Sequence, residues 1–360
     1  MKQLERYILS RLAVTTLLAL VVFVVLYAVF DLIAESDAVG KGNYSVATLF
    51  QYIGLRLPVY AYEIAPVAVL IGSLIALTSI SSNSEYAVMR TAGLSLRRMV
   101  QLLIIFALIC AAVSAFIGEW LMPKAYQQSR AVKYNARYGE DATLNHSGAL
   151  WFKSGQDMVQ VESMMPDGSL RNITRFQMAD NPEKGIVVLE HADSAQYQQN
   201  DQWQLFNVQR STIEDTQVQS FRQPENVIWK SQIDPNLLRT LIVEPQEMSV
   251  FALSEYIQYL KENKQRTSTY EVSFWRKIFY PFGSLAMAII ALVFTPLIAR
   301  HANMGWRIFL GMCFGVAFHF AGRFFSFYAD LFHLPPLWAG FLPVFILTLL
   351  AILGVWRWAK

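Results

Sequence analysis

The sequence predicts a membrane α-helical bundle of six transmembrane helices, with an all-β, jellyroll-like domain inserted between the third and fourth helices. Three observations lead to this fold class. Hydrophobic residues make up 54% of the 360 residues and charged residues only 16%, whereas ordinary soluble domains are roughly a quarter charged. Six long apolar runs punctuate the chain, and its middle is polar with alternating apolar and polar positions.

Each apolar run is long enough to cross a bilayer, since a helix needs about 20 apolar residues to span a core of roughly 30 Å. The first run is too long for the apolar part of a signal peptide, and no small-x-small cleavage site follows Phe30, so we interpret it as a retained anchor. The runs cover residues 12–30, about 57–80, 99–118, 278–299, about 308–328 and 334–356.

The placement of lysine and arginine predicts how the bundle is oriented, because short cytoplasmic loops are rich in these residues. With six crossings, both termini and two basic loops fall on one side, which is therefore predicted to be cytoplasmic. The opposite short loops are poor in basic residues: residues 34–56 hold only Lys41 and Arg56, and residues 329–335 hold none. The basic residues on the predicted cytoplasmic side are Lys2, Arg6, Arg11, Arg90, Arg97, Arg98, Arg300, Arg307, Arg357 and Lys360.

The polar middle of the chain is predicted to form the β-domain on the far side of the membrane. Alternation of apolar and polar residues is typical of half-buried strands. We expect residues 1–118 to hold helices 1–3, with a cytoplasmic loop at 81–98, and residues 278–360 to hold helices 4–6. Between them, residues 119–248 should form the β-domain and residues 249–277 an amphipathic elbow, with Ser254 as a candidate N-cap. The predicted strands lie at 149–153, 158–162, 170–178, 185–196, 203–212 and 227–232.

The cytoplasmic loop contains a short segment, residues 84–91, with helical character and Gly93 as its expected C-cap. One interpretation is an ordinary connector. The other is a coupling helix that docks into a cytoplasmic ATPase. The chain has no GxxxxGK[ST] phosphate-binding loop of its own, so active transport would need a partner that hydrolyses ATP.

Several classes of function are disfavoured. A net charge of +3, without a basic run interleaved with aromatics, does not favour nucleic acid. Cys110 and Cys313 both lie in apolar runs, so the polar segment holds no disulfide framework and no zinc site is suggested. No nucleophile–base pair or metal-ligand pattern is present, and the sequence predicts a chain that is not an enzyme and carries no cofactor.

At this point the sequence resembles the LptF/LptG family of lipopolysaccharide export permeases and is closer to the G-type members. The resemblance covers essentially the whole chain. It is carried by SEYAVMRTAGLS at 84–95, IGEWLMPKA at 117–125, YIQYLKENKQ at 256–265, SFWRKIFYPF at 273–282 and the proline pair at 335–336.

The resemblance implies a bacterial inner-membrane protein whose β-domain is periplasmic. In this family two homologous permeases, one LptF-like, pair around an LptB-like ABC ATPase dimer. Together they take lipopolysaccharide from the membrane and pass it to LptC-like and LptA-like periplasmic jellyroll proteins. The resemblance also places Glu85, Tyr86, Val88 and Met89 at the ATPase contact.

Lipid phosphates are expected to meet basic residues near the outer ends of the helices, because arginine pairs well with phosphate. The resemblance suggests Arg130 and Lys133, although interfacial anchors would look the same. Arg323 lies within the fifth apolar run with His319 one turn before it. It either lines the substrate cavity or extends to the interface. The same two interpretations apply to Glu63 in the second run, and for Glu63 the interfacial one is favoured.

One feature departs from the family, in which lysines are expected at the outer end of the first helix. This chain has Asp31, Glu35 and Asp37 there. Three explanations stay open. The phosphates meet the third helix and the partner permease, a divalent ion bridges the acidic groups, or the lipid A carries amine decorations.

Two other membrane functions compete with lipid export. A sensor or mechanotransmitter would use the β-domain to bind an envelope ligand, but it should carry a cytoplasmic signalling domain, and here only loops and short tails are predicted. An ion-coupled transporter should show charges and helix breaks at mid-membrane, where these runs are nearly all apolar.

Overall fold

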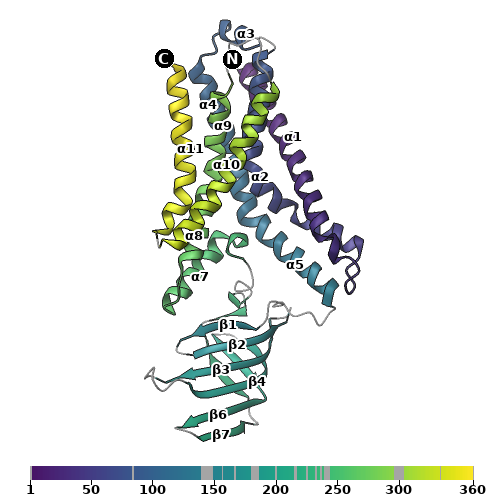
Figure 1. Ribbon diagram of the computed structural model, residues 1–360, viewed down its shortest axis with the longest axis vertical. Coiled ribbons are helices and arrows are strands. Elements are labelled where there is room, and N and C mark those ends of the chain that lie inside the picture. The colour runs from purple at the N-terminus through teal and green to yellow at the C-terminus, as the bar shows by residue number, and fades with distance from the viewer. Residues whose placement is uncertain are drawn as a thin grey trace.

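The computed structural model describes residues 2–82, 85–138, 149–155, 157–165, 168–179, 186–198, 201–214, 217–223, 226–231, 233–235, 237–238, 244–295, 304–332 and 334–359. The molecule is elongated (Figure 1), with a helical bundle at one end and a β-domain at the other. Both chain ends and the short helix α3 (Glu85–Thr91) lie at the end of the bundle farthest from the β-domain. Helix α7 (Val250–Glu262) lies between the bundle and the β-domain.

Among the described residues, six helical segments are long and apolar enough to cross a membrane, which confirms the predicted number. Two of the six are composite, because short turns of different helical pitch join consecutive helices. The segments are α1 (Lys2–Glu35), α2 (Val46–Ser82), α4 (Leu96–Phe116) with Ile117–Leu121 and α5 (Met122–Tyr138), α8 (Ser268–Phe279) with Tyr280–Phe282 and α9 (Gly283–Val293), α10 (Met304–Leu331), and α11 (Pro336–Ala359).

The third segment is much longer than the apolar run at 99–118. After α4, a π-helical turn at Ile117–Leu121 leads into the polar helix α5, so the helical path reaches Tyr138. Hydropathy detects only the part of a helix that lies in hydrocarbon, and polar residues beyond it can continue the same helix in water. The expected end of the fourth run, at 296–299, lies outside the described residues.

Helix α2 is the central helix of the bundle, and α1 crosses it closely. A Cβ atom at Gly72 would stand 2.3 Å from the Cα of Thr16, so only glycine permits this approach. At the same crossing the Thr15 hydroxyl donates a hydrogen bond of 2.8 Å to the Gly72 carbonyl. Small residues are typical of such contacts, because lipid offers helices no hydrophobic reason to associate. Beyond the crossing, most of the middle of α1 exposes apolar side chains.

The β-domain lies between the third and fourth segments in sequence, as predicted. Every described strand pair is antiparallel, and the order is β1-β2-β3-β4-β5-β8, with β6 paired to β4 and β7. The strands are β1 (Leu150–Ser154), β2 (Asp157–Met164), β3 (Leu170–Met178), β4 (Ile186–Gln198), β5 (Gln202–Phe206), β6 (Val208–Glu214), β7 (Gln217–Gln223) and β8 (Val227–Lys230).

Two details of the strand prediction were wrong. The single strand expected at 203–212 is two strands, because Asn207 adopts a positive φ of 55° that breaks the ladder between β5 and β6. The long β4 can therefore pair with β5 along one half and with β6 along the other. Strand β7 was not predicted, since its sequence QVQSFRQ is too polar for a clear alternating pattern.

Helix α7 closes the membrane-proximal end of the β-domain. Its N-cap is Ser249, whose hydroxyl accepts a 3.1 Å hydrogen bond from the Ala252 amide, so the suggested cap at Ser254 was wrong. The apolar face of α7 packs into the same core as the strand residues Trp203 and Trp229. The predicted elbow is therefore part of the joint between the bundle and the β-domain.

Candidate functional site

Helix α3 connects α2 and α4 at the end of the bundle opposite the β-domain. Gly93, with φ of +97°, follows the helix, and the Leu94 amide donates to the Met89 carbonyl at 3.0 Å, which is the hydrogen bonding of a glycine-ended helix. Tyr86 and Met89 are buried in the core shared with α2 and α4. Val88 points away from that core and is 68% exposed.

Glu85, the first residue of α3, is tied to the start of α1. The Tyr7 hydroxyl donates to one carboxylate oxygen at 3.0 Å, and an Arg11 nitrogen lies 3.8 Å from the other. Arg11 also donates to the Ser79 hydroxyl of α2 at 2.9 Å. The network therefore joins α1, α2 and α3, and among the four residues predicted to meet an ATPase, Glu85 and Val88 reach the surface.

The acidic residues at the far end of α1 face basic residues of the same chain. Asp31 lies 3.2 Å from an Arg56 nitrogen and accepts a hydrogen bond from the Tyr60 hydroxyl. Glu35 forms an ion pair with Lys133 of α5. Asp31 and Glu35 are four residues apart and so share one face of α1. Their charges are matched within the chain, which accounts for them without a bridging divalent ion.

Arg130 and Lys133, the two cations predicted to meet lipid phosphates from α5, lie over tyrosine rings. The Arg130 guanidinium is 5.3 Å from the centre of the Tyr126 ring and 5.9 Å from that of Tyr134. The Lys133 ammonium is 5.3 Å from the centre of the Tyr52 ring. Such cation–π contacts hold the two side chains against the protein.

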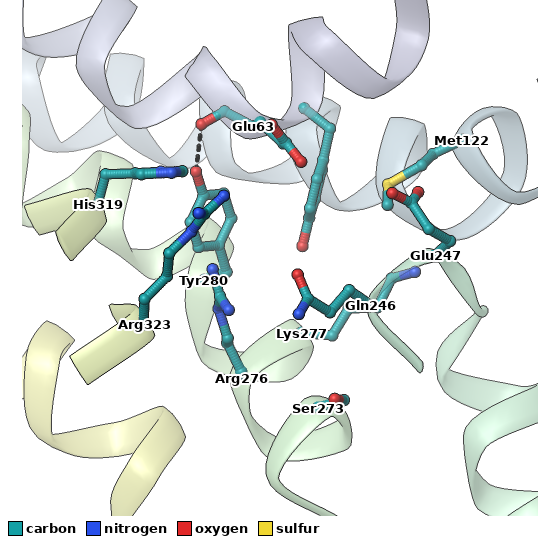
Figure 2. A pocket seen from close by; sticks show the side chains of 11 residues that line it. Glu63, Met122, Gln246, Glu247, Ser273, Arg276, Lys277, Tyr280, His319 and Arg323 are labelled. Atoms are coloured by element: carbon teal, nitrogen blue, oxygen red, sulfur yellow. Dashed lines mark hydrogen bonds between the residues drawn. The ribbon is translucent and has the colours of Figure 1, made fainter. Parts of the chain in front are cut away.

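A charged cleft, partly open to the outside, lies where α2, α5, α8 and α10 meet the turn Pro245–Glu247 before α7. Figure 2 shows His319, Arg276 and Arg323 on one side of this cleft and Glu247 with Met122 on the other. The acidic, basic and histidine side chains that line it are Glu63, Glu247, Arg276, Lys277, His319 and Arg323.

Hydrogen bonds hold the walls of the charged cleft together. The Tyr280 hydroxyl donates to the backbone carbonyl of Glu63, which joins the fourth segment to α2 (Figure 2). The Lys277 ammonium donates to the carbonyl of Met248 and so fixes the turn before α7 to α8. The Glu119 carboxylate accepts a 2.8 Å hydrogen bond from the Val250 amide at the start of α7.

Glu247 is a buried carboxyl group, only 7% exposed. Burial, followed by the nearby charge of Glu63, raises the pKa of Glu247 from 4.5 to about 7. Within the described part of the chain, its Oε2 atom has no hydrogen-bond partner. The cleft thus contains a carboxyl group that readily takes up a proton near neutral pH and that can accept a hydrogen bond.

Arg276 and Arg323 approach the charged cleft from two different helices, α8 and α10. Among the described residues, neither guanidinium has a carboxylate within 4.0 Å. Arg276 is half-buried and Arg323 is exposed. His319 lines the same cleft one turn before Arg323, so the two residues highlighted in the fifth apolar run do face a cleft.

The sequence had indicated Arg323 as a site residue but not Arg276, Lys277 or Glu247. The signal for the first two was present, because an arginine–lysine pair stands at the start of an otherwise apolar run. Glu247 offered no such signal, since it is one of many acids in a polar segment. Among the described residues, no group of three or more metal-binding side chains is present.

Comparison with known proteins agrees with this architecture. The family model of the lipopolysaccharide export system permease LptF/LptG matches residues 6–358. The chain is 28% identical over 354 residues to the lipopolysaccharide export system permease protein LptG of Haemophilus influenzae, covering 98% of this chain and 97% of that protein. It is 27% identical over 343 residues to the protein of the same name from Escherichia coli, covering 94% of each chain.

The family model covers nearly the whole chain, including all six membrane segments and the β-domain. The match therefore concerns the complete architecture described above and is not limited to one domain. The chain is a multi-pass membrane protein that belongs to the LptF/LptG family of lipopolysaccharide export system permeases.

Proposed function

We propose that this chain is one permease half of an ABC transporter that extracts lipopolysaccharide from the bacterial inner membrane and passes it to a periplasmic β-jellyroll bridge toward the outer membrane. The observation that carries the proposal is the match of the LptF/LptG family model over residues 6–358. The six apolar segments and the β-domain are the parts that such a task requires: a membrane path and a route out of it.

The orientation proposed for the chain places α3 and both termini in the cytoplasm and the β-domain in the periplasm. The start of α1, the end of α11 and the segment from α3 to the start of α4 carry basic residues, and they lie at the same end of the bundle, opposite the β-domain (Figure 1). This distribution agrees with the excess of lysine and arginine in cytoplasmic loops.

A separate ABC ATPase dimer, LptB-like, would supply the energy, because the sequence contains no phosphate-binding loop. Glu85, Tyr86, Val88 and Met89 form the proposed contact with that ATPase. Val88 offers an exposed apolar side chain and Glu85 a surface carboxylate. Tyr86 and Met89 would act from beneath, by anchoring α3 to the core shared with α2 and α4.

A second, LptF-like permease would complete the substrate cavity. The middle of α1 supports this proposal, because it carries a stripe of exposed apolar side chains on the face that does not pack against α2. Arg130, Lys133 and Arg323 are the residues proposed to meet lipid headgroups. The exposed stripe includes Val14, Leu17, Leu18, Val21, Val22, Val25 and Leu26.

The β-domain would hand the lipid on to LptC-like and LptA-like jellyroll proteins. Its sheet has described edges at β1, β7 and β8, and an unpaired strand edge is the kind of surface to which another β-domain can add. The predicted division places helices 1–3 at 1–118, the β-domain at 119–248, the elbow at 249–277 and helices 4–6 at 278–360, and we propose it with two changes: α5 belongs with helices 1–3 and α8 with helices 4–6.

The deciding experiment is mass spectrometry of the full-length chain, purified gently from its native membrane, with identification of all co-purifying proteins and lipids. A second six-helix permease, an ABC ATPase and bound lipid A would support the exporter. A lone chain with bulk phospholipid, under conditions that preserve other ABC complexes, would overturn it. A sensor whose β-domain binds an envelope ligand would then become the leading function.

A further inference from the structure

Four basic residues near the β-domain end of the bundle differ in how their charges are compensated. Arg56 and Lys133 are matched by the carboxylates of Asp31 and Glu35, so their charges are compensated within the chain. Arg276 and Arg323 line the charged cleft, and among the described residues no carboxylate lies within 4.0 Å of either. Direct ion pairs therefore compensate Arg56 and Lys133, whereas Arg276 and Arg323 interact with the carboxyl group of Glu63 in the same cleft only at longer range.

We propose that the charged cleft binds the phosphorylated headgroup of an amphiphile, with the phosphate on Arg276 and Arg323 and a neighbouring hydroxyl or amine on Glu247. The identification of that amphiphile as lipopolysaccharide rests on the proposed export function. The site itself rests on the geometry of the cleft.

The two arginines are suited to a phosphate because each guanidinium presents a planar set of donors that matches phosphate oxygens. They come from α8 and α10, so two rigid helices set their separation. Exposure of Arg323 leaves the site accessible from outside the protein. Because the cleft between them is partly open, a phosphate can approach both arginines from outside while the acyl chains remain beside the apolar helices.

Glu247 sets a second requirement for the ligand, which is a hydrogen-bond donor. Its buried Oε2 atom has no partner among the described residues, and a buried acceptor without a hydrogen bond is unfavourable. A ligand hydroxyl or amine would satisfy it. The favoured ligand is therefore a phosphate ester that carries a donor group nearby, rather than a bare anion.

The location gives ligand binding a structural consequence. Glu247 belongs to the turn that precedes α7, and α7 packs into the core of the β-domain. Lys277, another residue of the cleft, already holds this turn through the carbonyl of Met248. A headgroup that bridges Arg323 and Glu247 would connect α10 with the entrance to the β-domain.

Two amphiphiles share this chemistry: lipid A, with phosphorylated amino sugars, and phosphatidylethanolamine, with a phosphate and an amine. We would titrate the full-length chain in detergent with diphosphoryl lipid A, with dephosphorylated lipid A and with phosphatidylethanolamine, and measure binding by native mass spectrometry. The variants are Arg276→Gln, Arg323→Gln and the double substitution. Arg97→Gln is the matched control, because it removes the same charge from an exposed site at the other end of the bundle.

We expect each cleft substitution to weaken binding of diphosphoryl lipid A about tenfold or more, and Arg97→Gln to leave binding unchanged. Dephosphorylated lipid A should bind the original chain as weakly as diphosphoryl lipid A binds the double variant. Thermal unfolding shows whether each variant is folded. If the double variant does not fold, Arg323→Gln carries the test, because its side chain is exposed.

Failure of the site and failure of the export function give different results. Loss of phosphatidylethanolamine binding in the cleft variants, with no lipid A binding to the original chain, would support the phosphate site and contradict the proposed cargo. Unchanged lipid A binding in folded cleft variants would overturn the site and leave the export function standing.

Discussion

The Tyr7 hydroxyl, near the start of α1, donates a 3.0 Å hydrogen bond to the carboxylate of Glu85, the first residue of α3. This contact joins the segment proposed to meet the ATPase to a helix with a long exposed apolar surface. A displacement of α3 would therefore act on α1, which crosses α2 closely at Gly72 and is joined to α5 by the Glu35–Lys133 ion pair at its far end.

Glu85→Lys should abolish co-purification of the ATPase while the chain stays folded. The Glu85 ion pair is partly exposed, and such pairs contribute roughly 0–1 kcal/mol to stability, so thermal unfolding should change little. Tyr7→Phe is the matched control, because it removes the contact to α1 and keeps the carboxylate. Normal complex yield and ATP turnover with Glu85→Lys would exclude the coupling role.

Gly72→Ala should loosen the crossing of α1 and α2. The added methyl group would stand 2.3 Å from the Thr16 Cα atom, and the backbone would have to move apart, at a cost of about 1–3 kcal/mol. Gly54→Ala is the control in the same helix, since a Cβ atom there meets nothing within 4 Å. Thermal unfolding of both variants in detergent measures the difference. Equal stability would mean that the two helices are not closely packed in solution.

Glu247→Gln should remove a pH dependence of stability. The pKa of Glu247 is about 7 in the folded protein, above its ordinary value of 4.5, because the side chain is buried and lies near Glu63. The folded state thus holds the proton more tightly than the unfolded state. The resulting stabilisation is complete below pH 4.5 and is lost as the pH rises through 7, amounting to at most about 3 kcal/mol.

The measurement is thermal unfolding of the original chain and of Glu247→Gln between pH 5 and pH 8.5. The original chain should lose stability relative to the variant as the pH rises. Parallel curves over this range would show that Glu247 is ionised in the folded protein.

Glu190→Gln should destabilise the β-domain. The Glu190 carboxylate is 3% exposed and lies 2.9 Å from an Arg175 nitrogen and 3.6 Å from an Arg210 nitrogen. Removing the negative charge leaves a largely buried arginine with only Asp157, 3.3 Å away, to compensate it. Loss of one partner of a buried pair costs about 3–5 kcal/mol.

Hydrogen–deuterium exchange of the full chain can locate this effect. The substitution should speed up exchange of the amides in β3 and β4 and leave exchange in the helices unchanged. Glu255→Gln, an exposed position on α7, is the control and should leave exchange unchanged. Equal protection in Glu190→Gln and in the control would show that the ion pairs add no stability.

Much of the architecture could be predicted from the sequence because the bilayer imposes a simple rule. Uncharged runs such as residues 12–30 have to be helices in hydrocarbon, where every backbone group must be satisfied internally. The prediction was less accurate where no such rule applies. The polar helix α5 and the polar strand β7 lack a strong apolar pattern, and the break at Asn207 depends on a single backbone conformation.

The sequence by itself determined the six membrane segments, the inserted β-domain and the resemblance to LptF/LptG permeases. These depend on composition and order along the chain. Only the tertiary structure decided which charges are compensated. Asp31 and Glu35 match Arg56 and Lys133, whereas Arg276 and Arg323 meet in a cleft with Glu247. Electrostatic pairing depends on distances of a few ångströms between residues far apart in sequence, and folding alone sets those distances.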